Sequence, residues 1–142
     1  MKIAVSAMAD NLDAMVDARF GRCAYFVIVE VEGNEIKSSE AVKNPGVTAI
    51  GGAGIQAAQI VANKGVEALI TGNIGPNAFA ALSGTGIKVI TGIGGITVKG
   101  AVQRYLKGEL KETKQPTTPG FGPGRGMGRG MGPGMGRGFW QR

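Results

Sequence analysis

The clearest hydrophobic pattern in the chain has a period of two and lies between residues 23 and 32. β-Branched and aromatic residues dominate this stretch, and neighbouring side chains of a strand point to opposite faces, so it predicts a β-strand. Gly33 and Asn34 come next, and this dipeptide accepts positive φ and closes a two-residue hairpin. We therefore expect residues 36 to 42 to form a partner strand that runs antiparallel to it.

A shorter apolar run, residues 3 to 7, predicts another strand at the beginning of the sequence. The residues from 10 to 17 are mostly polar and acidic, and they follow neither the helical nor the strand period. We therefore expect a long, flexible loop between this strand and the strand at 23 to 32.

After Asn44 the pattern changes to helices and strands in alternation. Apolar residues at helical spacing predict helices from about 54 to 63, from Gly75-Pro76 onward and from about 98 to 106, and proline suits the first helical position. Short apolar runs at 66 to 70 and 87 to 90 predict strands. Since helices separate these strands, they should be parallel and joined by right-handed crossovers. Altogether this is an α/β domain with a five-stranded mixed sheet and flanking helices.

The end of the chain differs in composition from the rest. Ten of the 26 glycines lie between Gly120 and Arg142, and the arginines there contribute four of the six net positive charges. Such a segment buries too little apolar surface to offset its chain entropy. We therefore predict one domain over residues 1–115 and a flexible tail over 116–142. The basic pI follows largely from the tail and is weak support for a nucleic-acid partner.

Two counts restrict the chemistry. The chain has no histidine and a single cysteine, Cys23, which excludes an internal disulfide, a catalytic triad with histidine and a zinc site made of several thiolates. No apolar stretch reaches the length of a membrane span, and the N-terminus has no signal-like segment. The expectation is a protein of the cytoplasm, a reducing compartment, without a membrane partner.

Three glycine-rich loops precede the predicted helices, at residues 51–54, 71–76 and 91–95. In an open α/β sheet such loops gather at the carboxyl edge of the parallel strands, and helix N-termini there favour anions. The candidate residues are Gly52, Gly54, Gly72, Asn73, Gly75, Asn77 and Gly94. Glycine also serves tight turns and close packing, which is the alternative for each single loop. A dinucleotide or P-loop site has little support, because no ribose-binding acid or GK[ST] motif accompanies the glycines.

A second candidate is the segment Arg19-Phe20-Gly21-Arg22-Cys23, just before the strongest strand. Arginines beside a thiol lower its pKa, and a thiolate is a soft ligand for iron or molybdenum-sulfur centres. One thiol cannot assemble a cluster alone but could anchor a preformed one. The alternative is that Cys23 is a small buried hydrophobe and that the arginines are surface charges.

These pieces, in this order, resemble the dinitrogenase iron-molybdenum cofactor biosynthesis family, the NifX-like small carrier proteins of archaea and anaerobic bacteria. The likeness covers about residues 1 to 110. The motifs that carry it are Met1-Lys2-Ile3-Ala4-Val5, Arg19-Phe20-Gly21-Arg22-Cys23 with Tyr25-Phe26, Gly54-Ile55-Gln56-Ala57-Ala58, Ile70-Thr71-Gly72 through Gly75-Pro76-Asn77-Ala78-Phe79, and Gly86-Ile87-Lys88-Val89.

The resemblance implies a ribonuclease-H-like fold without nuclease activity. It also implies binding and delivery of an iron-molybdenum or iron-sulfur type cluster, with cofactor-assembly proteins as donor and acceptor. In this chain the nearest soft ligand is Cys23, which we expect to be the metal ligand. Relatives commonly carry a histidine before the second strand, whereas this chain has Ala18-Arg19-Phe20 there, so ligation by imidazole is excluded. Met8 and Met15 are poorer soft ligands in the long loop.

Other readings remain open. The same loops could serve a nucleotide- or phosphate-binding regulatory module without metal. An enzyme ranks third, because Asp10, Asp13 and Asp17 have no second carboxylate cluster and the first strand offers only Ser6. The tail, with methionines at every fourth residue, could be a solvated extension, a contact for a partner, a binder of nucleic acid or a collector of soft cations. The oligomeric state stays open.

Overall fold

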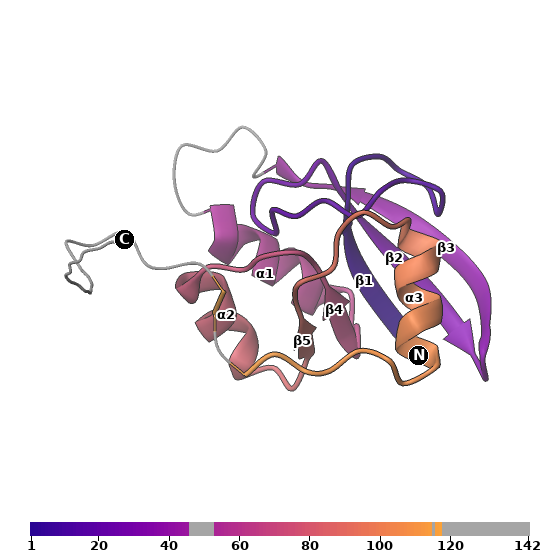
Figure 1. The fold of residues 1–142 in the computed structure, drawn as a ribbon. Helices are drawn as coiled ribbons and strands as arrows, with labels where there is room; N and C mark the ends of the chain where they lie inside the picture. Colours follow the sequence, from indigo (N-terminus) through magenta and orange to yellow (C-terminus); the bar gives the residue numbers. More distant parts are fainter. Residues whose placement is uncertain (46–52, 115, 118–142) are drawn as a thin grey trace, which may run out of the picture.

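A five-stranded mixed sheet with helices on both faces forms the fold (Figure 1). The computed structural model describes residues 1–45, 53–114 and 116–117. The elements in chain order are β1 (Lys2–Ala7), β2 (Tyr25–Glu32), β3 (Glu35–Lys43), α1 (Ala53–Asn63), β4 (Ala68–Ile70), α2 (Pro76–Ser83), β5 (Lys88–Ile90) and α3 (Val98–Leu106).

The strands lie in the order β3-β2-β1-β4-β5. β1, β2 and β3 are antiparallel neighbours, and Gly33 at the hairpin has a φ of 65°, as the sequence predicts. β4 pairs parallel with both β1 and β5. β2 and β3 lie on one side of β1, whereas β4 and β5 lie on the other, so the strand order reverses between the parallel neighbours β1 and β4, where an open α/β sheet has its ligand crevice.

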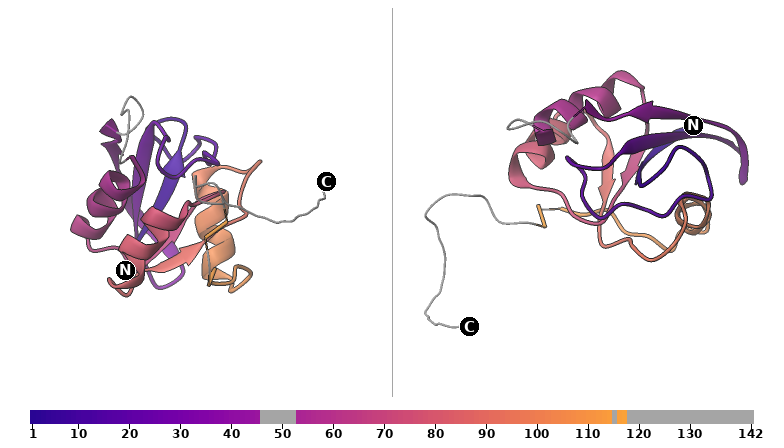
Figure 2. Two further views of the ribbon diagram at one scale, coloured as in Figure 1. Left: turned by 90° about the vertical axis from the view of Figure 1, so that its left-hand side faces the viewer. Right: turned by 90° about the horizontal axis from the view of Figure 1, so that it is seen from above.

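Each face of the sheet has its own apolar core. One core joins strand residues such as Val5 and Ile70 to Val98 and Val102 of α3. The other joins Leu69 on the opposite face to α1 and α2. Figure 2 shows the same layers, with α1 and α2 on one side of the sheet and α3 on the other.

Every predicted strand and helix is present, with ends shifted by at most two residues. α1 begins at Ala53, and β4 is shorter than the predicted 66–70 because only residues 68 to 70 pair with β1. The predicted domain boundary after residue 115 is not a break in contacts, since Thr117 still hydrogen-bonds Ile74. Gly52 and tail residues 118–142 lie outside the described residues.

Among the described residues, none of the helices combines the length and the apolar character that crossing a bilayer requires.

Candidate anion-binding site

A buried polar cluster joins the carboxyl ends of β1 and β4. The hydroxyl oxygens of Ser6 and Thr71 lie 2.7 Å apart, and Ser6 Oγ is also 2.7 Å from the carbonyl oxygen of Asp17. All three residues are almost completely buried. Hydrogen bonds satisfy polar groups that would otherwise be costly to bury. This cluster fixes the segment that leads to Arg19 over the boundary between β1 and β4, where the strand order reverses.

The segment from residue 8 to residue 19 contains no helix or strand, which confirms the predicted loop, but contacts with other parts of the chain hold it in place. Isolated bridges join Ala7 to Val16, Met15 to Thr97 and Arg19 to Asn73. The amide of Asp17 also donates to the Ser6 carbonyl over 2.8 Å. The segment has no periodic pattern because its partners lie in other parts of the chain, yet backbone hydrogen bonds fix it along its length.

Gly72 has a steric role under this segment. A Cβ at residue 72 would lie 2.5 Å from the Cα of Ala18, which is closer than real contacts allow. The amide of Asn73 donates to the Ala18 carbonyl over 2.7 Å. Two of the predicted site residues, Gly72 and Asn73, therefore bring the loop after β4 against the segment before Arg19.

Arg19 is held in place by Asp17. Its Nε and Nη2 donate to the two carboxylate oxygens at 3.2 and 3.3 Å, and its backbone N–H donates to Oδ1 at 2.9 Å. The Asp17 side chain is 3% exposed, whereas that of Arg19 is 67% exposed. The hydrogen bond and charge of Asp17 raise the pKa of Arg19 further above its ordinary value. Arg19 therefore presents a fixed, permanently charged guanidinium to solvent.

The first turns of α1 and α2 pack next to the arginine segment. A Cβ on Gly21 would lie 3.2 Å from the amide nitrogen of Gly54, and a Cβ on Gly54 would lie 3.2 Å from the Cβ of Ala78. These glycines allow three backbone segments to approach one another. Arg22, half-buried, follows Gly21 directly in this arrangement.

The N-terminus of α2 is suited to a negative charge. None of the three helices has an acidic residue in its first turn. Gly75 is the N-cap of α2, Pro76 follows it, and no side chain caps the helix. The exposed Asn77 lies in the same turn. Unsatisfied N–H groups and the helix dipole favour anions at such a position.

The third predicted loop, residues 91–95, does not offer free helix N–H groups to an anion as the loop before α2 does. The N–H groups of Val98 and Lys99 in the first turn of α3 donate to the carbonyls of Ala14 and Leu12, and Thr97 caps the helix. These contacts satisfy the α3 N-terminus within the fold. Gly94 is exposed, with open space around its would-be Cβ. The geometry thus narrows the site to the arginine segment and the first turns of α1 and α2.

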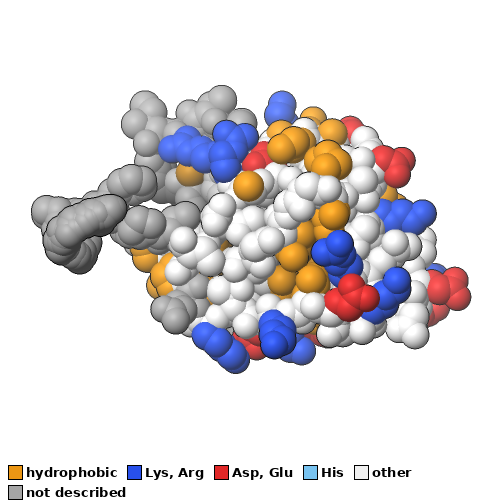
Figure 3. Space-filling view, in the orientation of Figure 1, with side chains coloured by type: hydrophobic (Ala, Val, Ile, Leu, Met, Phe, Trp, Pro, Cys, Tyr) orange, Lys and Arg blue, Asp and Glu red, His pale blue; other side chains and the backbone are white. Residues whose placement is uncertain are grey.

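Figure 3 shows a group of lysine or arginine side chains at the upper left of the molecule. This is close to the place where Figure 1 shows the beginning of α1. A concentration of positive charge there agrees with a site for an anion.

The expected lowering of the Cys23 pKa is wrong. The residue is 0% exposed, and burial, followed by the negative charge of Asp17, raises the pKa of its thiol to about 12. The thiol donates to the Phe20 carbonyl over 3.3 Å. The guanidinium of Arg19 pairs with Asp17 and stays exposed to solvent. Its positive charge therefore does not offset the rise in the Cys23 pKa that burial causes. Cys23 is therefore a small buried residue, as in the alternative interpretation of the sequence.

Phe20 and Asn44 support the arginine segment from below. Phe20 is 2% exposed and packs on Phe26, with 5.3 Å between the ring centroids, so it is a core residue. The side-chain amide of Asn44 donates to the carbonyls of Gly21 and Cys23 at 3.2 and 2.9 Å. Asn44 was not among the predicted site residues. The only feature of the sequence that indicated a supporting role is its position just after a predicted strand.

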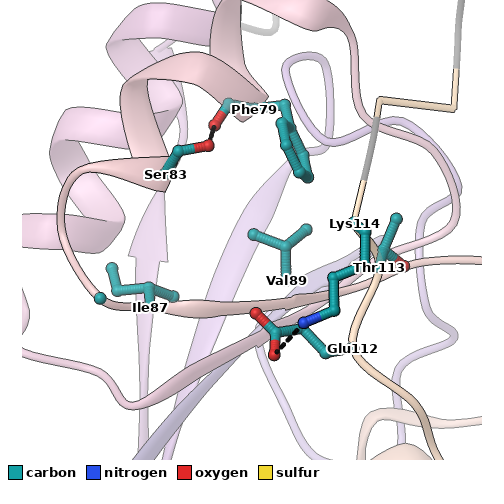
Figure 4. A pocket seen from close by; sticks show the side chains of 8 residues that line it. Phe79, Ser83, Ile87, Val89, Glu112, Thr113 and Lys114 are labelled. Carbon is teal, nitrogen blue, oxygen red and sulfur yellow. Dashed lines mark hydrogen bonds and ion pairs between the residues drawn. The ribbon is translucent and has the colours of Figure 1, made fainter.

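A cavity of about 260 Å³ lies elsewhere, between α2, β5 and residues 112–114 (Figure 4). Apolar side chains of Phe79 and Val89 form part of its wall, and Glu112 and Lys114 pair with each other at 3.4 Å. None of the residues predicted for the anion site lines this cavity. We therefore do not place the anion-binding site in this cavity.

The chain was compared with known proteins. The model of the family "Dinitrogenase iron-molybdenum cofactor" matches residues 1–108. The uncharacterized protein MJ0580 of Methanocaldococcus jannaschii is 35% identical over 112 residues, which cover 79% of this chain and 91% of that protein.

Solved structures give the same result. The apo form of the orange protein from Desulfovibrio gigas is 44% identical with a TM-score of 0.77, and the alignment covers 82% of this chain and 96% of that chain. TM1290 of Thermotoga, assigned to the DUF35 family, is 34% identical with a TM-score of 0.68, and the alignment covers 82% and 98%. The chain therefore belongs to the dinitrogenase iron-molybdenum cofactor family.

Proposed function

We propose that this protein binds an anionic metal-sulfur cluster, of the iron-molybdenum or iron-sulfur type, without catalysing a reaction, and delivers it during cofactor assembly. One observation carries the proposal. Arg19 has a fixed and exposed guanidinium and bridges to Asn73 just before α2, while Gly21 packs against Gly54 in the first turn of α1, and neither first turn contains an acid. Membership of a family described by the iron-molybdenum cofactor supports the choice of cargo.

The chemistry of such a site is charge pairing and hydrogen bonding. Sulfide ligands carry the negative charge of a preformed cluster, and guanidinium and backbone N–H groups are donors that suit it. Arg22 and the amides near Gly54, Gly75 and Asn77 complete the donor set. Cys23 becomes a ligand only if the arginine segment opens, because its thiol is buried and its pKa is raised to about 12. Binding by charge alone leaves the cluster ready for transfer to an acceptor protein.

The strand order and directions support the ribonuclease-H-like classification as part of this proposal. β1, β2 and β3 are antiparallel and are followed by two parallel strands on the other side of β1. A nuclease of this kind needs several carboxylates at strand ends, whereas β1 and β4 end in the hydroxyls of Ser6 and Thr71. This supports a binding role.

The proposal is tested by anaerobic titration of the protein with tetrathiomolybdate and with iron-sulfur clusters. Metal content and visible absorption are measured after gel filtration. We expect stoichiometric retention by the wild type and by Cys23→Ala, and loss in the double variant Arg19→Gln with Arg22→Gln. The matched control is Lys37→Gln with Lys107→Gln, which removes the same charge at the opposite end of the sheet and should retain the cluster.

Each other outcome has a definite meaning. Loss in Cys23→Ala alone would replace binding by charge with anchoring by a thiolate. Failure of the wild type to retain either species would reject the carrier function. A gain in thermal stability with a nucleotide, in a colourless protein, would then favour the phosphate-binding module.

A further inference from the structure

The described part of the chain ends next to the candidate site. Residues 112–114 lie along β5, where the amide of Thr113 donates to the Val89 carbonyl over 2.6 Å. Thr117 lies at the loop after β4, where it exchanges two hydrogen bonds with Ile74, of 2.9 and 3.0 Å. Ile74 follows Asn73, the residue that bridges to Arg19. The tail of residues 118–142 therefore starts at the carboxyl edge of the sheet.

The loop after β1 presents an unusual surface at the same edge. The large apolar side chains of Met8 and Met15 are 58% and 39% exposed, and the amide of Met8 donates to the Met15 carbonyl, so the two residues are neighbours. Asp10 and Asp13 are exposed on the same loop, and neither forms an ion pair with a described residue. Figure 3 shows apolar and acidic side chains together at the top of the molecule.

The tail has the complementary composition. It contains four arginines, three methionines, three aromatic residues and no acid: Phe121, Arg125, Met127, Arg129, Met131, Met135, Arg137, Phe139, Trp140 and Arg142. Its 25 residues span at most about 90 Å when extended, far more than the width of this small domain. Attachment at Thr117 keeps the tail at a high effective concentration near the loop.

We propose that the tail of residues 118–142 docks on the loop of residues 8–15 of its own chain, with its arginines on Asp10 and Asp13 and its methionine and aromatic side chains on Met8 and Met15. The family match ends at residue 108, so the tail adds this contact to the shared domain. The contact does not require a bound cluster and is independent of the carrier function.

Trp140 is the only tryptophan in the chain and reports on docking in the full-length protein without cargo. We expect a blue-shifted emission and slow quenching by acrylamide at low salt. Both should be lost in Asp10→Asn with Asp13→Asn, and also in Met8→Ser with Met15→Ser. The control Glu30→Gln with Glu35→Gln removes the same charge from exposed positions on β2 and β3 and should keep them.

Far-UV circular dichroism confirms that the variants are folded. Emission typical of a water-exposed tryptophan in the wild type, or emission unchanged by the Asp10 and Asp13 substitutions, would overturn the proposal. A blue shift that disappears on dilution would also overturn it, because the tail would then dock on a second copy. High salt should weaken the contact, since it screens exposed charges.

Discussion

The carboxylate of Asp17 and the guanidinium of Arg19 form an ion pair with one buried and one exposed partner. The Asp17 side chain is 3% exposed, that of Arg19 is 67% exposed, and their closest atoms are 3.2 Å apart. Removing either partner breaks the same contact. The consequences differ. Without Arg19 the carboxylate of Asp17 stays buried and unpaired, whereas without Asp17 the guanidinium of Arg19 stays in contact with water.

Arg19→Gln should therefore destabilise the fold more than Asp17→Asn. The first leaves a buried carboxylate without its cation, at a cost of about 1–3 kcal/mol. The second leaves a guanidinium that water can solvate, and asparagine keeps an acceptor for the Arg19 backbone N–H, so the cost should be about 1 kcal/mol or less. Urea denaturation of both variants measures the difference. Equal losses would mean that Asp17 is better hydrated than its burial indicates.

The same pair affects the cargo. Asp17 fixes Arg19 but also neutralises part of its field. Asp17→Asn should therefore strengthen the retention of tetrathiomolybdate, and Arg19→Gln should weaken it. Equilibrium dialysis at low and high salt measures both, and the effect of each substitution should shrink as salt screens the exposed charge. Weaker retention by Asp17→Asn would show that positioning of Arg19 matters more than its net charge.

Gly72 and Gly94 provide a matched pair of glycines from two of the predicted loops. A Cβ on Gly72 would lie 2.5 Å from Ala18 Cα, whereas nothing lies within 4 Å of a Cβ on Gly94. Gly72→Ala should cost about 1–3 kcal/mol, because backbone must move to make room. Gly94→Ala should change the free energy of unfolding by less than about 0.5 kcal/mol. Thermal denaturation of both variants would contradict this account if their losses were similar.

Most of the fold could be predicted from local sequence patterns. The alternation through β2, the Gly33 turn and the helical spacing in α3 depend on residues close in sequence, and each was predicted correctly. The bridges that fix residues 8–19 depend on partners such as Thr97 that are distant in sequence, so no local periodic pattern predicts them. A segment held by distant contacts has the same sequence signature as a flexible loop.

The site was predicted less well, for the same physical reason. Residue types alone indicated that the arginine segment and the glycine loops lie at the edge of the sheet. They could not show that Ala14 and Leu12 already satisfy the N-terminus of α3, or that Ser6 meets Thr71 across 65 positions. The pKa of Cys23 depends on burial, which is a property of the packed domain and not of its neighbours in sequence.

Burial should make the Cys23 thiol inert in the folded protein. It is 0% exposed and its thiolate is disfavoured, whereas thiol reagents attack the thiolate. We expect Ellman's reagent to react with the native protein only at the rate of opening, and immediately in denaturant. Fast labelling of the native protein would show that the arginine segment opens readily, which is the condition for a thiolate ligand.

The same burial predicts a loss of stability at alkaline pH. Desolvation raises the pKa of Cys23 from an ordinary value of 9.0 to about 12. The folded state therefore keeps the proton over a range in which the unfolded state releases it, and the contribution is complete below about pH 9 and lost as pH rises toward 12. A difference of this size corresponds to at most roughly 4 kcal/mol. Because burial also raises the pKa of Tyr105, the measurement compares the pH slope of the unfolding free energy in wild type and in Cys23→Ala. The variant should be less stable near neutral pH, because alanine leaves a small cavity, but its slope should be shallower. Parallel slopes would mean that the thiol ionises in the folded protein much as it does in the unfolded chain.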